Sequence, residues 1–257
     1  MRLLDKTALI TGGNSGIGLA TARLFVNEGA HVAITGRDKT TLDAVAEELG
    51  DKLLAFQADV LDTKAREVVF ETIKEEFGHL DIVFANAGIG RTGSIAETSE
   101  ELFDEVLRIN LTGAFLTVKS ALPLLRRGSS IILNGSIAEF HGFPPGAGSY
   151  AASKGGMHSM SRSMASELSP LGIRINVVAP GPIKTSIVDR ASLPAERVAA
   201  IVKKLESTVP LGRFGEPEEV ATVVLFLASD DSSFVHASEI VVDGGAIGAV
   251  FGAPVYR

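Results

Sequence analysis

The sequence predicts an α/β fold in which about seven parallel strands form one doubly wound sheet with helices on both faces. Three observations support this prediction: short apolar runs, longer segments between them with apolar residues three and four positions apart, and a glycine-rich turn directly after the first run. The two patterns alternate along all 257 residues, and no linker, repeat or low-complexity tract interrupts them. Residues 1–257 are therefore expected to form a single domain.

Most of the expected strands are apolar throughout instead of alternating, which is typical of strands buried on both faces of a parallel sheet. In chain order they are Thr7–Thr11, His31–Thr35, Leu53–Asp59, Leu80–Ala85, Ser130–Leu133, Arg174–Ala179 and Glu239–Val242. The stretch from Thr185 to Phe214 is irregular, apart from a helical pattern near Ala195–Glu206 that precedes the last helix and strand.

The segments between the strands carry their apolar residues on one side, so each is expected to form a helix that covers one face of the sheet. Leu42, Val45 and Leu49 share one side of such a segment, and Val69 and Ile73 share one side of another. Connections of this kind between parallel strands are right-handed crossovers, which is what makes the sheet doubly wound.

The amino-acid composition limits the classes of protein to which this chain can belong. Apolar residues make up 46% and charged residues 21%, which supports a large core and argues against disorder. The net charge is −7 without any basic stripe, so nucleic acid is not expected as a partner. Cysteine is absent and no two of the five histidines stand at a metal-ligand spacing, so no metal site is predicted. No secretory leader and no apolar run of ~18 residues is present, which favours a cytoplasmic protein without a membrane span.

A glycine-rich turn follows the first expected strand and opens the first expected helix. Gly12 ends the strand, and Gly16 and Gly18 lie at the start of the helix. Backbone N–H groups and the positive end of the helix dipole converge at such a turn, and glycine leaves room for a diphosphate to approach them. The spacing differs from the usual dinucleotide fingerprint, so an ordinary strand–helix turn remains the alternative for this motif alone.

Tyr150 and Lys154 are four residues apart, which places their side chains on one face of a helix. A phenol with a pKa near ~10 needs help to exchange a proton at neutral pH, and a neighbouring ammonium favours its ionised form. Ser136 ends an expected strand and can offer a hydroxyl to a substrate oxygen. Taken alone, the pair is more simply interpreted as a chance Tyr–Lys pair on a solvated helix.

Taken together and in order, these motifs resemble the short-chain dehydrogenase/reductase family, in its single-domain subfamily with a Rossmann-like fold. The resemblance extends from about Lys6 to Gly245. Ala85 stands where the family usually has asparagine, a change expected to be tolerated. The matching elements are Thr11-Gly12-x-x-x-Gly16-x-Gly18, Asn86-Ala87-Gly88, Asn110, Ser136, Tyr150-x-x-x-Lys154 and Pro180-Gly181-Pro182-Ile183-Lys184-Thr185.

The resemblance implies hydride transfer between a nicotinamide cofactor and a carbonyl or secondary alcohol. It implies Tyr150 as general acid/base, Lys154 as the group that lowers its pKa and holds the ribose, Ser136 as the carbonyl-orienting group, and Asn110 as the holder of a relay water. The cofactor-binding residues expected from the resemblance and from the charge pattern are Gly12, Asn14, Ser15, Gly16, Ile17, Gly18, Arg37, Asp59, Val60, Asn86, Ala87, Gly88, Tyr150, Lys154, Pro180, Gly181, Ile183 and Thr185.

The residues after the second strand favour NADP(H) over NAD(H). NAD-preferring relatives typically carry an acidic residue at the position of Gly36, where its carboxylate accepts from the ribose hydroxyls. Here a glycine without a side chain occupies that position. Arg37 follows it, and its guanidinium can pair with the 2′-phosphate of NADP(H). Asp38 argues instead for NAD(H), because its carboxylate can pair with Arg37 or accept a hydrogen bond from the ribose. A solvated Arg37 and an NAD(H)-dependent enzyme remain the alternatives.

The substrate is not predicted. The loop between Ser136 and Tyr150 is one residue longer than usual in the family, and Phe140, His141 and Phe143 in it either wall the substrate pocket or pack on the protein itself.

Two alternative functions, and the oligomeric state of the protein, are also considered. A non-catalytic dinucleotide-sensing protein is disfavoured by the complete set of four catalytic residues, and an enoyl reductase by the short Tyr–Lys spacing. The uncharged tail at 246–256 would expose an apolar patch on a monomer, which predicts a homo-oligomer, most simply a tetramer. The alternative is that this tail folds back over its own pocket.

Overall fold

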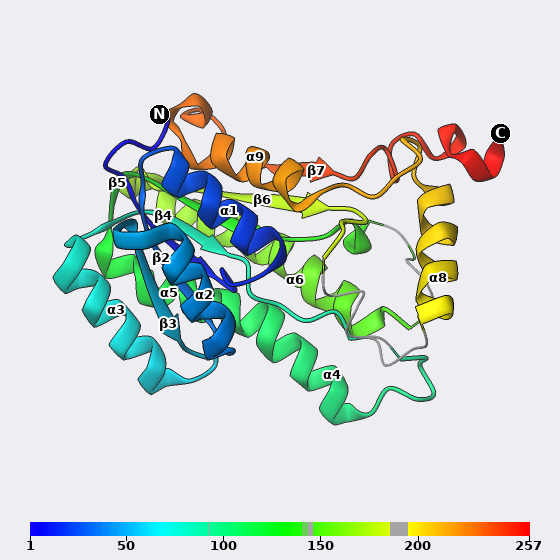
Figure 1. Ribbon diagram of the computed structural model, residues 1–257, viewed down its shortest axis with the longest axis horizontal. Helices are drawn as coiled ribbons and strands as arrows, with labels where there is room; N and C mark the ends of the chain where they lie inside the picture. The colour runs from blue at the N-terminus through cyan, green and yellow to red at the C-terminus, as the bar shows by residue number, and fades with distance from the viewer. Residues whose placement is uncertain (92, 141, 143–145, 186–194) are drawn as a thin grey trace.

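The computed structural model describes the chain apart from residues 92, 141, 143–145 and 186–194 (Figure 1). Its seven strands form one parallel sheet in the order β3-β2-β1-β4-β5-β6-β7, which confirms the predicted doubly wound sheet. The strands are β1 (Thr7–Thr11), β2 (His31–Gly36), β3 (Leu53–Gln57), β4 (Leu80–Ala85), β5 (Leu125–Asn134), β6 (Arg174–Pro180) and β7 (Glu239–Val242).

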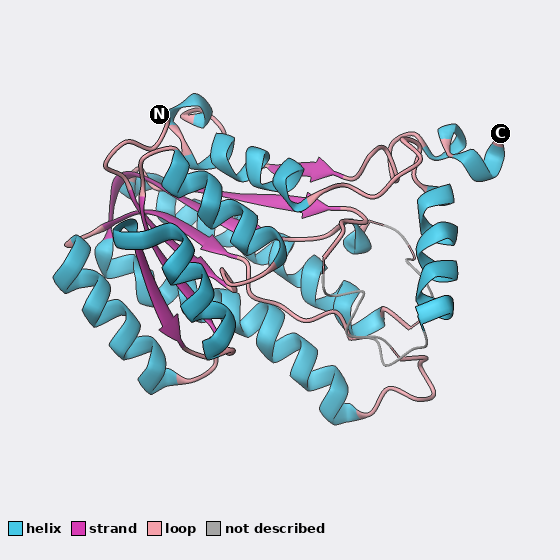
Figure 2. Cartoon of the chain, viewed as in Figure 1, coloured by secondary structure: helices cyan, strands magenta, loops and turns pink. Residues whose placement is uncertain are grey.

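The described helices surround this sheet, as Figure 2 shows with helices in cyan and strands in magenta. Asp38, Asp62 and Ser99 begin three of them, where each side chain accepts a backbone N–H of the first turn. Of the described helices, none is long and apolar enough to cross a membrane. The helices are α1 (Gly16–Asn27), α2 (Lys39–Leu49), α3 (Thr63–Phe77), α4 (Glu100–Leu107), α5 (Gly113–Ala121), α6 (Gly148–Leu168), α8 (Ala195–Thr208) and α9 (Pro217–Ala228).

Two apolar clusters hold the helices on opposite faces of the sheet. Successive residues of β1 divide between them, with Ile10 in the cluster that contains α1, α2 and α9, and Leu9 in the cluster that contains α3, α5 and α6. Both side chains are at most 1% exposed. Because successive side chains of a strand point to opposite faces, the uninterrupted apolar runs in the sequence correspond to a sheet buried on both sides.

Two strand boundaries differ from the sequence prediction by more than one residue. β3 ends at Gln57 instead of Asp59, because the Asp59 carboxylate accepts the Leu61 N–H at 2.9 Å and turns the chain out of the sheet. β5 begins at Leu125, five residues before the predicted Ser130, and its pairing with β4 shifts register after Leu80. The exposed polar residues at the start of β5 hid this part of the strand from a prediction based on apolar runs.

The strand order reverses between β1 and β4, so neighbouring connections leave the sheet in opposite directions there. In an open α/β sheet this divergence creates a crevice beyond the carboxyl ends of the strands. The glycine-rich turn after β1 and the residues that follow β4, β5 and β6 all lie at that edge, which is where a site is expected.

Candidate active site

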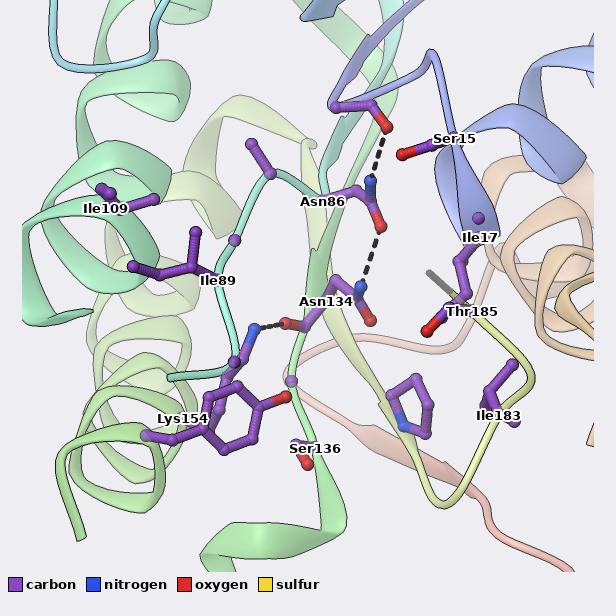
Figure 3. A pocket seen from close by; sticks show the side chains of 18 of the residues that line it. Ser15, Ile17, Asn86, Ile89, Ile109, Asn134, Ser136, Lys154, Ile183 and Thr185 are labelled. Carbon is purple, nitrogen blue, oxygen red and sulfur yellow. Dashed lines mark hydrogen bonds between the residues drawn. The ribbon is translucent and has the colours of Figure 1, made fainter. Parts of the chain in front are cut away.

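A cavity of about 570 Å³ lies at the carboxyl ends of the strands (Figure 3). Its lining includes every site residue predicted from the sequence except Gly18 and Asn110. Predicted residues from seven separate stretches of the chain, between Gly12 and Thr185, therefore meet in one place. The lining residues that were not predicted from the sequence are mainly apolar. They include Ile89, Ile109, Ala147, Leu205 and Phe214.

The glycine-rich turn forms a narrow cradle at one end of this cavity. Gly12 and Gly16 have φ of +64° and +52°, a conformation that other residues rarely adopt. A Cβ on Gly16 would lie 3.3 Å from the Thr185 Cγ2, so a side chain there would narrow the channel between the turn and the segment after β6. The Ser15 side chain does not cap α1, which leaves the first N–H groups of the helix for an anion. This cradle fits the diphosphate of a dinucleotide.

Gly18 contributes through packing rather than by lining the cavity. A Cβ at this position would lie 2.1 Å from the Gly12 carbonyl oxygen and 2.7 Å from the Asn86 Nδ2. Only glycine therefore lets α1 approach the end of β1 this closely. The close approach places the first turn of α1 against the cradle.

A chain of hydrogen bonds joins the cradle to the catalytic end of the cavity (Figure 3). Asn86 Nδ2 donates to the Thr11 carbonyl at 2.9 Å and to the Gly12 carbonyl at 3.2 Å, and Asn134 Nδ2 donates to Asn86 Oδ1 at 2.8 Å; Figure 3 shows the last two bonds. Lys154 Nζ then donates to the Asn134 carbonyl at 2.6 Å. Asn134 was not singled out from the sequence, although an asparagine at the end of a strand two residues before Ser136 is a signal that could have found it.

Ser136, Tyr150 and Lys154 meet at this end of the cavity. The short 3₁₀ turn η4 (Ile137–Glu139) follows Ser136, whose Oγ accepts the Ala138 N–H at 3.2 Å and so begins that turn. The Tyr150 hydroxyl lies beside the Ser136 side chain, near enough for Ser136 to act on its pKa. Lys154, one turn further along α6, places its Nζ 5.6 Å from the centre of the Tyr150 ring. The hydroxyls of Ser136 and Tyr150 and the ammonium of Lys154 thus lie at the same wall of the cavity.

Burial changes the proton affinity of both titratable groups. Loss of solvent raises the pKa of Tyr150, and the neighbouring Ser136 side chain opposes this increase only in part. Burial also lowers the pKa of Lys154 to about 8, while the negative charge of Glu139 raises it. In the absence of a cofactor, Tyr150 is therefore a protonated hydrogen-bond donor at neutral pH and Lys154 a cation.

Asn110 is fully buried in the π-helical turn Arg108–Thr112 between α4 and α5. Its Oδ1 accepts the Ile89 N–H at 2.8 Å, and its Nδ2 donates to the Ile89 carbonyl at 3.0 Å and to Ser153 Oγ at 3.1 Å. The side chain thus fastens the segment after β4 to α6, one residue before Lys154. Its expected part in a proton relay stays a prediction.

The far end of the cavity lies at the ends of β2 and β3, where Arg37, Asp59 and Val60 line it. Asp38, the residue that argued against NADP(H), caps α2 by accepting the Thr41 N–H at 3.1 Å. Asn14 lies over Gly36, because a Cβ on Gly36 would be only 2.4 Å from the Asn14 Oδ1. The position that would carry an acidic side chain is therefore filled by a neutral amide.

The loop after Ser136 is described only in part. Phe140 is 45% exposed and meets the His158 ring edge-on, with the ring centres 6.3 Å apart. His141 and Phe143, the other two residues expected to wall a substrate pocket, lie outside the described residues. Leu205 from α8 and Phe214 supply apolar lining from the opposite side of the cavity.

Comparison with known proteins adds an independent observation. Residues 12–246 match the sequence model of the family described as Enoyl-(Acyl carrier protein) reductase. A 3-oxoacyl-(acyl-carrier-protein) reductase of Thermotoga maritima is 40% identical over 252 residues, which cover 96% of this chain and 100% of the relative. An NADP-dependent (R)-specific alcohol dehydrogenase of Lentilactobacillus kefiri is 39% identical over 251 residues, which cover 95% and 97% of the two chains. A short-chain type dehydrogenase/reductase from Mycobacterium marinum has a crystal structure that matches with a TM-score of 0.88 at 34% identity, over 96% of this chain and 97% of that one.

Proposed function

This chain belongs to the short-chain dehydrogenase/reductase family of oxidoreductases that act on CH–OH and C=O groups, and on that premise we propose that it interconverts a ketone and a secondary alcohol with NADP(H). The main support for the proposal is that Ser136, Tyr150 and Lys154 lie together at one end of the cavity. The glycine-rich turn forms the other end. The two relatives named above as a 3-oxoacyl reductase and an alcohol dehydrogenase support this type of substrate.

The chemistry of the residues fits this reaction. The bound nicotinamide cofactor supplies the hydride for reduction and accepts it in oxidation. Ser136 and Tyr150 offer two hydroxyls to the substrate oxygen, which gains negative charge as the carbonyl is reduced. Tyr150 donates its proton to that oxygen, because burial keeps its pKa raised and the hydroxyl protonated. In the oxidation direction Tyr150 accepts the alcohol proton, and the positive charge of Lys154 favours the phenolate that this requires.

The family description names enoyl reduction, and one assay separates the two reactions. Purified protein is mixed anaerobically with NADPH or NADH, and absorbance of the reduced nicotinamide is followed with simple ketones, a 3-oxoacyl thioester and a 2-enoyl thioester. The proposal predicts turnover with at least one ketone or 3-oxoacyl substrate. Turnover of the enoyl thioester alone would replace the ketoreductase assignment, and binding of the nucleotide without any turnover would favour the sensing alternative.

The preference for NADP(H) is proposed from three features between the end of β2 and the start of α2. Gly36 offers no carboxylate, Asp38 is engaged in capping α2, and the exposed Arg37 lines the cavity. Asn14, over Gly36, also offers a neutral amide. A 2′-phosphate would therefore meet the Arg37 cation and the Asn14 amide, while the Asp38 carboxylate, which also lines the cavity, is bound to the N-terminus of α2. The alcohol dehydrogenase of Lentilactobacillus kefiri, named as NADP-dependent, is consistent with this preference.

Arg37→Ala is expected to reduce kcat/KM for NADPH by about 10- to 150-fold, the equivalent of the roughly 1.5–3 kcal/mol of a charged hydrogen bond. Kinetics with NADH should stay nearly unchanged, because Arg37 has no phosphate to bind there. The measurement is kcat/KM for both cofactors in the wild type and in the variant. Equal kcat/KM for both cofactors in the wild type would overturn the assignment.

A converse pair of variants serves as the matched control. Gly36→Asp alone should weaken both cofactors, because its Cβ would lie 2.4 Å from the Asn14 Oδ1 and displace that side chain. Combining Gly36→Asp with Asn14→Gly removes the clash and should improve NADH relative to NADPH, since the new carboxylate accepts from ribose hydroxyls and repels a phosphate. An unchanged ratio in the double variant would place the specificity elsewhere.

A homo-oligomer, most simply a tetramer, is proposed from the C-terminal tail. Phe251 is 87% and Tyr256 60% exposed, and Arg257 bonds to the Pro210 carbonyl near the end of α8. The described lining of the cavity includes no residue beyond Phe214, which does not support the alternative that the tail covers the pocket. Light scattering should give a mass several times 26.9 kDa, and Phe251→Ser with Tyr256→Ser should lower it. A wild-type mass near that of one chain would contradict the proposal.

We further propose that residues 1–257 act as one domain, since all seven strands belong to one sheet. A cytoplasmic location stays a prediction from the sequence.

A further inference from the structure

Three ionisable side chains from distant parts of the chain meet outside the cavity. Glu139 comes from η4, His158 from α6 and Glu239 from β7. The Nδ1 atom of His158 lies 2.5 Å from Glu139 Oε1 and 2.5 Å from Glu239 Oε2. The side chains of the two glutamates are only 5% and 9% exposed, and that of the histidine 16%. None of the three is among the residues that line the cavity.

Hydrogen bonds within the trio do not satisfy its polar atoms. One nitrogen of an imidazole carries one proton or one lone pair, so Nδ1 cannot serve two carboxylate oxygens at once. The remaining oxygens, Glu139 Oε2 and Glu239 Oε1, are buried and have no hydrogen-bond partner in the described structure. Two buried carboxylates side by side also repel each other, and a neutral imidazole does not offset their charge. The cluster therefore needs additional positive charge, from a bound cation or from an extra proton.

From this geometry we propose that Glu139, His158 and Glu239 bind a divalent transition-metal ion, with Zn²⁺ or Mn²⁺ as the ions that match the donors. One oxygen from each glutamate and the imidazole nitrogen all lie within 4.8 Å of one another. Imidazole together with carboxylate is a donor set that suits Zn²⁺ and Mn²⁺, whereas Ca²⁺ and Mg²⁺ favour oxygen alone. Three protein ligands leave further coordination positions for water.

The ion would join three elements that frame the catalytic residues. Glu139 lies three residues after Ser136, and His158 lies two helical turns after Tyr150 on α6. β7 is the edge strand of the sheet and supplies the third ligand. An ion held between them fixes the turn that carries Ser136 against the helix that carries Tyr150. The three residues are positioning residues, because none of them reaches the cavity.

The site was not predicted from the sequence, where no histidine stands at a metal-ligand spacing. Glu139 and His158 are 19 residues apart, and Glu239 follows a further 81 residues later. Only the placement of η4 and α6 beside β7 brings them together. A lone proton shared by the two carboxylates is the competing occupant. Burial and the neighbouring Glu139 raise the pKa of Glu239 to about 8, while the charge of Arg162 opposes that increase.

The experiment is metal binding by the whole protein after chelator treatment and dialysis. Titration with Zn²⁺, and separately with Mn²⁺, is followed by calorimetry, and the bound metal is counted by elemental analysis. We expect about one ion per chain, a higher midpoint of thermal unfolding with metal, and a visible spectrum with Co²⁺ in which nitrogen and oxygen ligands are evident. Activity is not part of the readout, so failure of this proposal is distinct from failure of the ketoreductase assignment.

Variants separate this site from adventitious binding. His158→Gln and Glu239→Gln should each weaken metal binding by at least about 100-fold, since each removes a ligand. His31→Gln is the control, because His31 begins β2, five strands away from β7 in the sheet, lies beside Phe77, and should leave metal binding unchanged. The Co²⁺ spectrum of the wild type tests the site even where a variant folds poorly. A wild type that binds no metal, or binds it as well after His158→Gln, would overturn the proposal in favour of the shared proton.

Discussion

Replacing Tyr150 by phenylalanine is expected to lower kcat by about 10²- to 10⁴-fold, the usual contribution of a positioned general acid. The substitution removes from the wall of the cavity the hydroxyl beside Ser136 that is proposed to donate a proton to the substrate oxygen. The aromatic ring stays, so its contact with the Lys154 Nζ and the start of α6 are preserved. Cofactor binding and the thermal midpoint should therefore change little.

The measurement is kcat with the best substrate of the panel, together with cofactor affinity by fluorescence and unfolding by calorimetry. Tyr256→Phe is the matched control, because the chain has two tyrosines and this one is 60% exposed in the tail. It should retain wild-type turnover. A Tyr150→Phe enzyme that kept more than about a tenth of kcat would remove Tyr150 from its role as general acid.

Lys154→Met is expected to give the second-largest effect, on two independent readouts. The pH at which alcohol oxidation reaches half its maximum should rise by about one unit or more, because the phenolate of Tyr150 loses a cationic neighbour and the pKa of that hydroxyl increases. Cofactor affinity should also fall, because the Asn134 carbonyl loses its donor and the cavity loses a cation that could hold ribose oxygens.

The sign of this effect follows from the pKa of Lys154 itself. Burial lowers that pKa to about 8, so the ammonium is present below pH 8 and is lost as the pH rises above it. The difference between wild type and variant should thus be largest below pH 8 and shrink above. Lys74→Met, at an exposed position of α3, is the control and should leave the pH profile in place. An unshifted profile with unchanged cofactor affinity in Lys154→Met would remove this lysine from both roles.

Local patterns in the chain were sufficient for most of the fold. Each of the seven strands contains a short apolar run, and each pattern of three- and four-residue spacing that was singled out forms a helix. The prediction was wrong at the start of β5, where the pairing of Leu125 with Leu80 depends on a neighbouring strand and a register shift. Arg126 there donates to the buried Asp81 carboxylate at 2.8 Å, a contact between residues 45 positions apart that no local pattern indicates.

The site residues also fall into those that local sequence patterns predicted and those whose role depends on tertiary contacts. Motifs that lie within a few residues of each other, such as the glycine turn and the Tyr150–Lys154 pair, were found because their spacing follows directly from helix and turn geometry. Gly18 and Asn110 were found as well, but the structure decides what they do. A Cβ on Gly18 would strike the Gly12 carbonyl, and the Asn110 amide is bonded to Ile89 and Ser153.

The sequence by itself determined the doubly wound sheet, the glycine-rich turn after the first strand and the Tyr150–Lys154 pair, because strand burial, helix spacing and turn conformation are local properties. The tertiary structure alone decided that Asp38 caps α2 and that Asn14 occupies the space above Gly36. It also decided that Glu139, His158 and Glu239 share one buried cluster. Burial and contact between distant segments are products of the packed sheet and helices, and they set which polar groups are left without partners.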